Sequence, residues 1–242
     1  MEVHPVITNN GNFSKPTADK PALLSSDEVS TLFHEFGHAL HGLLSDCRYN
    51  RLSGTSVSRD FVELPSQIME HWVFEPEVLK TYAKHYKTGE VIPQELIDKL
   101  KKASHFNQGF ITVEYLAASY LDMDWHTLTE SEERDVIGFE NESMSEIGLI
   151  PQIVSRYRSP YFQHIFSGGY SSGYYSYIWA EVLDSDAFQA FKETSLFDRK
   201  TARSFRENIL ARGGTEDPMT LYLRFRGAAP KVEPLLKNRG LQ

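Results

Sequence analysis

The chain has 242 residues, of which 40% are hydrophobic and 24% are charged, so it is long enough to fold around an ordinary hydrophobic core. No apolar run approaches the roughly 20 residues of a membrane-spanning helix. With 33 acidic and 25 basic residues, the formal charge of -8 repels phosphate backbones and anionic lipid, so neither nucleic acid nor a membrane is an expected partner.

The cellular compartment is indicated by two features of the sequence. The single cysteine, Cys47, cannot form a disulfide within the chain, as is usual in a reducing compartment. The first residues, MEVHPVITNNGNFSKP, lack the basic and apolar regions of a secretory signal peptide. Together these features favour a cytoplasmic protein.

The N-terminal segment, residues 1–23, differs from the rest of the chain. It is interrupted by prolines and a glycine and contains short β-prone runs such as Val6-Ile7-Thr8, which predicts a strand or an extended lead-in. The remainder has a mainly helical pattern with no internal repeat and no low-complexity linker. We therefore expect a mainly α, multi-helix fold with a short extended N-terminal segment.

The first helix is predicted from its cap and its periodicity. Ser25 and Glu28 have the S-x-x-E spacing of a capping box. Apolar residues then recur at helical intervals from Val29 to Leu44. We expect the helix to begin after Ser25 and to end near Leu44.

A second helix is predicted after the loop that contains Ser53-Gly54-Thr55. Asp60 can cap this helix, and Pro65 can kink its first turn. Its apolar positions are Phe61, Leu64, Ile68 and Trp72.

The rest of the chain alternates between helical patterns and one long irregular segment. Helices are expected near residues 76–88, 94–104, 111–128, 134–148, 171–193, 198–212 and 217–226. Between Ile150 and Gly169 the chain combines prolines, glycines, two arginines and several aromatic residues. Long irregular connections are usually lids or binding loops, so we expect this segment to form part of a functional site.

The first predicted helix contains His34-Glu35-Phe36-Gly37-His38, which matches H-E-x-x-H. Residues four apart lie one turn above each other, so both imidazoles can hold one ion while Glu35 reaches a water molecule at that ion. Zinc suits these ligands, and a catalytic zinc site needs a third protein ligand and an open position. The small Gly37 permits the close approach of a ligand or a neighbouring segment.

The third metal ligand must come from another part of the chain. Glu63 lies on the second predicted helix, and an antiparallel helix pair would bring it beside the two histidines. The same helix face carries Gln67 and Glu70, either of which could orient a histidine ligand through a hydrogen bond.

Other interpretations of the motif stay open on the pattern alone. A five-residue pattern can arise by chance, with the histidines only packed or solvated. Glu35 and His38 also form E-x-x-H, but a di-iron carboxylate bundle needs two such motifs and the sequence has no second one. His41 could compete as a ligand, although we interpret it as a structural residue.

A second candidate element runs from Gly168 to Tyr177, GGYSSGYYSY, and joins a glycine-rich loop to tyrosines. Phenolic hydroxyls can donate hydrogen bonds to a developing oxyanion, as peptide hydrolysis requires. However, Tyr174, Tyr177 and Ile178 lie at helical spacing, which is typical of core residues. The pattern alone leaves both interpretations open.

Three separated stretches resemble a known family: FHEFGHALHGLL, LSGTSVSRDFVELPSQIMEHW and HIFSGGYSSGYYSYIWAEVLDSDAF. They resemble the thimet oligopeptidase and oligopeptidase A family of zinc metallopeptidases, and bacterial peptidyl-dipeptidases look most similar. The similarity runs from about Val6 to the C-terminal NRGL in the family's order. It implies that residues 1–242 form a zincin-like catalytic domain.

The resemblance also implies a set of metal and catalytic residues. One Zn2+ per chain would be bound by His34, His38 and Glu63, with Glu35 as the general base. A zinc-stabilised helical module without turnover is the rival interpretation, and Glu35 argues against it because a structural site needs no base.

Substrate contacts are implied in the same way. Tyr177 and Tyr170 would contact the scissile or adjacent carbonyl, and His164 would bind the substrate backbone. Tyr174 is a further candidate for substrate contact. The spacing between His164 and Tyr170 departs from that of animal family members and matches the bacterial branch.

The largest departure from the family is length, because its members are much longer proteins. Their N-terminal helical region forms the opposite wall of a deep channel, so the resemblance implies a C-terminal fragment that lacks this region and need not be active alone. The expected substrates are short peptides, from which C-terminal dipeptides are released; internal cleavage of oligopeptides is the alternative. Arg156 and Arg158 are candidates for binding a free carboxylate.

Overall fold

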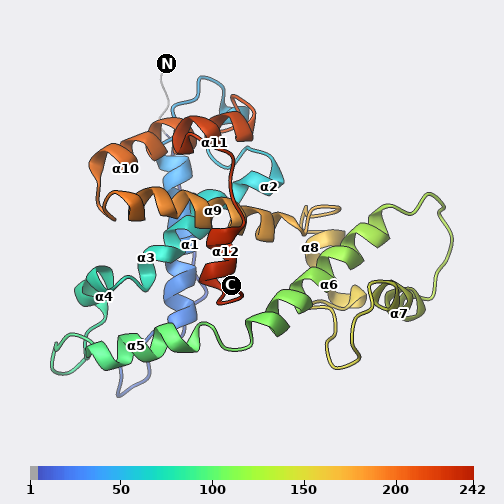
Figure 1. The fold of residues 1–242 in the computed structure, drawn as a ribbon, viewed down its shortest axis with the longest axis horizontal. Helices are drawn as coiled ribbons and strands as arrows, with labels where there is room; N and C mark the ends of the chain where they lie inside the picture. The colour runs from blue at the N-terminus through green and yellow to red at the C-terminus, as the bar shows by residue number, and fades with distance from the viewer. Residues whose placement is uncertain (1–4) are drawn as a thin grey trace.

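The computed structural model describes residues 5–242, which form an assembly of α-helices with no strand in that range (Figure 1). The mainly α prediction is confirmed. The N-terminal segment is extended but forms no strand from residue 5 to 23, and residues 1–4 of the predicted lead-in lie outside the described residues. No helix in the described part is long and apolar enough to cross a membrane.

Helix α1 spans Ser26–Leu43, close to the predicted bounds, and its capping box is present. Glu28 accepts hydrogen bonds from the backbone N–H and the hydroxyl of Ser14, each at 2.7 Å. The backbone N–H of Ser25 and these two donors lower the pKa of Glu28 to about 2. The extended N-terminal segment is thereby tied to the first turn of α1.

The predicted second helix is divided into α2 (Arg59–Val62) and α3 (Leu64–Val73), with Glu63 at the junction. Pro65 lies in the first turn of α3, where its missing N–H costs no helical hydrogen bond. The expected kink is therefore a break between two helices.

The predicted cap of this second helix is wrong. Ser58 occupies the N-cap position of α2, so Asp60 lies inside the helix. The carboxylate of Asp60 instead accepts a hydrogen bond of 2.9 Å from the hydroxyl of Tyr175. Near the start of a helix, an aspartate can either cap the helix or accept a hydrogen bond from a distant side chain. The local sequence does not distinguish these two roles.

Helices α1 and α3 pack as an antiparallel pair. Ser30, early in α1, contacts Glu70, late in α3, whereas His38, late in α1, contacts Glu63 just before α3. The two backbones approach closely at Gly37, where an added Cβ would lie 2.2 Å from the carbonyl oxygen of Pro65. Only glycine fits this crossing.

The remaining elements are α4 (Pro76–Tyr82), α5 (Gln94–Ala103), α6 (Gln108–His126), α7 (Val136–Glu146), α8 (Gln163–Phe166), α9 (Ser176–Glu193), α10 (Arg199–Phe205), α11 (Pro218–Arg226) and α12 (Glu233–Asn238). Short turns add the 3-10 elements η1 (Asn50–Leu52) and η2 (Ser159–Tyr161) and the π-helical η3 (Arg206–Leu210). The short α12 was not predicted.

Two helices are shorter than the sequence pattern predicts. Helix α4 ends at Tyr82, and the chain then turns back through a bridge between Lys84 and Val91. Helix α9 begins at Ser176 rather than near residue 171, because Ser172 has a φ of 51°, which no α-helix accommodates.

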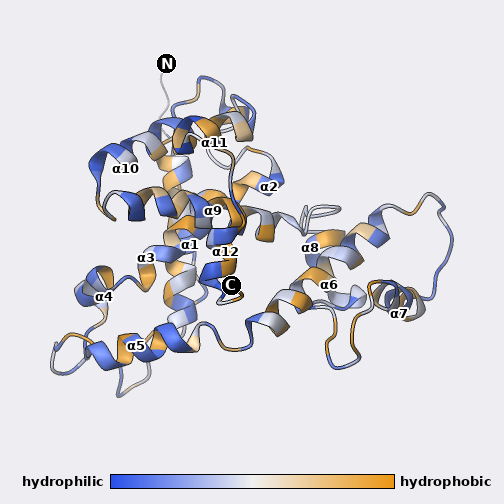
Figure 2. Cartoon of the chain, viewed as in Figure 1, coloured by the Kyte–Doolittle hydropathy of each residue, from blue (hydrophilic) through white to orange (hydrophobic). Residues whose placement is uncertain are grey.

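Two buried clusters hold the helices together, and Figure 2 shows apolar and polar residues alternating along the helices. The larger cluster joins α3, α9, α10, η3 and α11 through residues such as Leu64, Ile68, Leu183, Phe188, Phe205, Ile209 and Leu221. The smaller cluster joins α6 to the tyrosine-containing segment through Tyr115, Leu121, Phe162, Ile165 and Tyr174. In Figure 1, α6, α7 and α8 form a separate lobe to the right of the α1–α3 pair.

Candidate metal centre

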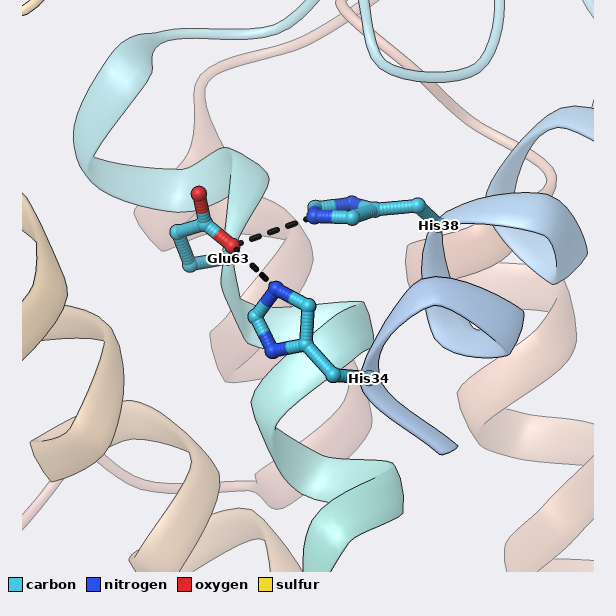
Figure 3. Close-up of side chains that lie close together, drawn as sticks. All are labelled: His34, His38 and Glu63. Carbon is cyan, nitrogen blue, oxygen red and sulfur yellow. Dashed lines mark ion pairs between the residues drawn. The ribbon is translucent and has the colours of Figure 1, made fainter. Parts of the chain in front are cut away.

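Three side chains converge at the α1–α3 contact: His34, His38 and Glu63 (Figure 3). Oε2 of Glu63 lies 3.3 Å from Nε2 of His34 and 3.1 Å from Nε2 of His38. Ligands at ordinary zinc distances on a tetrahedral ion are separated by about 3.3 Å. Both distances to Glu63 fit one small tetrahedral ion, and all three ligand atoms lie within 4.8 Å of one another.

Glu63 is fixed by four neighbours. Oε1 accepts a hydrogen bond from the hydroxyl of Tyr170 at 2.8 Å, and Oε2 accepts one from Oγ of Ser66 at 2.9 Å. Burial raises the pKa of Glu63, but the contacts with His34, His38 and Tyr170 outweigh it and hold the pKa well below its usual range. Glu63 is thus an oriented anion, as a metal ligand must be.

His34 is oriented by a second carboxylate. Its Nδ1 lies 2.7 Å from Oε1 of Glu70, so its Nε2 faces Glu63. Burial lowers the pKa of His34, but the two carboxylates outweigh this effect and raise the pKa to about 10. Gln67 contacts neither histidine and donates to the carbonyl oxygen of Tyr177 at 3.3 Å.

Replacing Glu70 by alanine is expected to weaken zinc binding by about 10- to 100-fold, because His34 loses the partner that fixes its ring. Competition with a chromophoric chelator measures this affinity. Gln67→Ala, on the same helix face, is the matched control and should retain wild-type affinity. Equal affinities in both variants would contradict the orienting role of Glu70.

Glu35 and His41 occupy different environments on the same helix. Glu35 is partly exposed and, with His38, lines a cavity of about 540 Å³ that the extended segment also borders. His41 is fully buried, and burial lowers its pKa to about 4. It lies outside the metal-ligand group, in agreement with the structural role expected for it.

Tyr170 and Tyr177 lie beside the metal-ligand group. Their rings stack with centroids 5.0 Å apart, and the guanidinium carbon of Arg59 lies 4.8 Å from the ring centroid of Tyr170. Burial is the largest cause that raises the pKa of both phenols. Both hydroxyls are therefore neutral hydrogen-bond donors at neutral pH.

With this geometry in view, comparison with known proteins identifies the family. The model of Peptidase family M3 matches residues 2–241. The chain belongs to Peptidase family M3. This result confirms the expected relationship to zinc metallopeptidases of the thimet oligopeptidase and oligopeptidase A type.

Individual relatives cover nearly all of this M3 chain. The dipeptidyl carboxypeptidase of Escherichia coli is 50% identical over 242 residues, which are 99% of this chain and 36% of that protein. Oligopeptidase A of Escherichia coli is 44% identical (98% of this chain, 35% of that protein), and saccharolysin of Saccharomyces cerevisiae is 38% identical (99% and 34%). The chain thus spans about a third of the length of these relatives.

A second cavity of the M3 chain, of about 320 Å³, contains the other predicted substrate residues. His164, Tyr174 and Tyr177 line it together with Arg156. Burial and the charge of Arg156 lower the pKa of His164, so its imidazole is neutral. Tyr174 is only 2% exposed and also packs in the smaller core cluster.

The irregular segment predicted to form part of a site supplies both His164 and Arg156 to this cavity. The second candidate arginine, Arg158, is instead paired with the buried carboxylate of Glu140. Since that pairing satisfies its charge, Arg158 has a structural role. Of the two candidate arginines, Arg156 is the one that lines the cavity.

Two further residues, which the sequence pattern did not indicate, support the centre. Ser66, one helical turn after Glu63, donates to the carboxylate, and Arg59, one turn before it, contacts the ring of Tyr170. Their spacing from Glu63 could have indicated a shared helix face. The partner tyrosine, far away in sequence, could not have been found in this way.

Proposed function

We propose that this protein hydrolyses peptide bonds in short peptides, using one Zn2+ bound by His34, His38 and Glu63. The observation that supports this function best is the convergence of three ligand atoms beside Glu35 in a member of a peptidase family. Zinc, when bound, would supply a Lewis acid that lowers the pKa of a water molecule toward roughly 7 and polarises the substrate carbonyl.

The side chains of the chain perform the remaining steps. Glu35 accepts the proton of the attacking water and delivers it to the leaving amine. Tyr177 and Tyr170 donate hydrogen bonds to the oxygen of the attacked carbonyl, where negative charge develops. Because Tyr170 donates to Glu63 at 2.8 Å, it must exchange that acceptor for the substrate.

The second cavity provides the substrate contacts. The neutral His164 hydrogen-bonds the peptide backbone, and Tyr174, which also lines the cavity, is a further substrate contact. Residues 1–242 act as one catalytic unit, because each of these side chains and all three metal ligands come from it.

Release of C-terminal dipeptides is the proposed mode of cleavage. Arg156 places a cation in the cavity next to Tyr177, where it can pair with a free C-terminal carboxylate. Two bacterial relatives carry the name dipeptidyl carboxypeptidase, which agrees with this mode. Internal cleavage of oligopeptides, as the names of the oligopeptidase A relatives suggest, is the alternative.

Replacing Arg156 by methionine is expected to abolish the preference for peptides with a free C-terminus, because the cation that pairs with the carboxylate is lost. The ratio of kcat/KM for a free peptide to that for its C-terminal amide measures the preference. Arg203→Met, on the distant α10, is the control and should keep the wild-type ratio. An unchanged ratio in the Arg156 variant would favour internal cleavage.

Removal of the metal tests the proposed function itself. Chelation is expected to abolish cleavage of a quenched fluorescent peptide, and one equivalent of zinc per chain should restore it. The full-length product of the gene should be used, because the chain spans about a third of the length of its relatives. Zinc-loaded protein without turnover would instead support a zinc-stabilised helical fragment.

We further propose that a region corresponding to the rest of these relatives forms the opposite wall of the site. The cytoplasm is the proposed location, supported by the single cysteine. The names of plant relatives include both a cytosolic and an organellar oligopeptidase, so location varies within the family.

A further inference from the structure

A buried carboxylate on α6 holds the turn between the two tyrosines of the candidate site. Asp122 is 0% exposed, and its two oxygens accept different backbone N–H groups of this turn. Oδ1 accepts from Ser172 at 3.0 Å, and Oδ2 accepts from Tyr174 at 2.8 Å. Hydrogen bonds to an ionised carboxylate are stronger than those to a neutral acceptor.

The turn itself has an unfavourable backbone geometry. Ser172 adopts a left-handed conformation with a φ of 51°, which a residue with a Cβ rarely adopts. Such a conformation persists only where the surroundings fix it, and Asp122 supplies two of the fixing contacts.

Tyr115 provides a second attachment from the same face of α6. Its hydroxyl donates to the carbonyl oxygen of Tyr174 and accepts the backbone N–H of Ile178 at 3.3 Å. His126, one helical turn after Asp122, has its Nδ1 2.8 Å from Oδ1 of Asp122. Helix α6 therefore forms hydrogen bonds with both backbone N–H and backbone C=O groups of the turn.

We propose that Asp122 is a positioning residue that holds the phenols of Tyr170 and Tyr177 in the geometry needed at the substrate carbonyl. Tyr170 precedes Ser172 by two positions and Tyr177 follows Tyr174 by three, so release of the turn displaces both hydroxyls. A displacement of about 1 Å can cost on the order of 100-fold in rate. This inference rests on the proposed roles of the two tyrosines.

The direct test is Asp122→Asn in the full-length gene product with zinc bound. Asparagine has the same shape but presents an N–H₂ group where one oxygen accepted a hydrogen bond. Amide hydrogen exchange in residues 170–178 should become faster, and kcat should fall by about 10- to 100-fold with KM within about twofold. Zinc content should not change, because the metal ligands lie on other elements.

Asp186→Asn is the matched control. Asp186 is also buried and accepts a hydrogen bond of 2.7 Å from the hydroxyl of Tyr222, but it lies on α9 away from the turn. It should lower stability without changing the exchange of the turn or kcat. Tyr115→Phe, which removes the second attachment, should reproduce the Asp122 effect and serves if the Asp122 variant does not fold.

A double-mutant cycle with Tyr177→Phe separates positioning from stability. If Asp122 acts through the tyrosines, Asp122→Asn should add little to the loss already caused by Tyr177→Phe. If amide hydrogen exchange and kcat are unchanged in Asp122→Asn while Tyr177→Phe has lost activity, the positioning role of Asp122 is refuted. The proposed function would then remain intact. Wild-type activity in Tyr177→Phe would refute the tyrosine role and the positioning role together.

Discussion

Glu35→Gln is expected to lower kcat for peptide hydrolysis by about 10²- to 10⁴-fold while zinc stays bound. Glutamine has the size of glutamate but cannot accept the proton of the attacking water. Glu35 lies between the two histidines in sequence but does not belong to the group of ligand atoms, so its replacement should leave that group in place. Cleavage of a quenched fluorescent peptide, together with zinc analysis of the same sample, measures both quantities.

The control for Glu35→Gln is Glu77→Gln, an exposed substitution of the same chemistry on α4, which should behave as wild type. Substantial activity in zinc-loaded Glu35→Gln would show that another group accepts the proton. Loss of zinc would show that Glu35 supports the centre rather than the proton transfer.

Gly37→Ala is expected to disrupt the metal centre and to destabilise the protein by about 1–3 kcal/mol. The added methyl group would lie 2.2 Å from the carbonyl oxygen of Pro65 and 2.5 Å from Cα of Ser66. Both contacts are with backbone, so α3 must move away from α1. Because Glu63 adjoins α3 and the histidines lie on α1, zinc affinity and the free energy of unfolding should both decrease.

The control for this substitution is Gly109→Ala. Gly109 also lies in a helix, α6, but its added methyl group would meet no atom within 4 Å. Alanine should be neutral or stabilise the protein by about 0.4–1 kcal/mol at this position. Urea unfolding and a zinc titration of the two variants measure the contrast; equal behaviour would show that the helices tolerate the side chain at Gly37.

Local features of the fold follow from the sequence more closely than features that depend on distant residues. The capping box at Ser25 and the bounds of α1 were predicted well, because both depend on residues within a few positions of each other. The division of the second helix at Glu63 was expected only as a kink. Pro65 marks the place, but the packing of α3 against α1 decides how far the axis turns.

The tyrosine segment illustrates the limit of periodicity. Its helical spacing predicted a helix from residue 171, but the chain stays non-helical until Ser176. The left-handed Ser172 is held there by Asp122, fifty positions away on α6. A tertiary hydrogen bond therefore overrides the local preference, and no pattern within the segment could reveal it.

The sequence by itself determined the helical class, the pair of histidines on one helix face, the glutamate between them and the family, since residue spacing within a helix and the order of motifs are properties of the linear chain. Only the tertiary structure decided which side chain orients His34, which of Arg156 and Arg158 lines the cavity and what supports the tyrosines. Glu70, Arg156 and Asp122 gain these positions through contacts between elements. Such contacts depend on helix crossing and packing, which local periodicity does not encode.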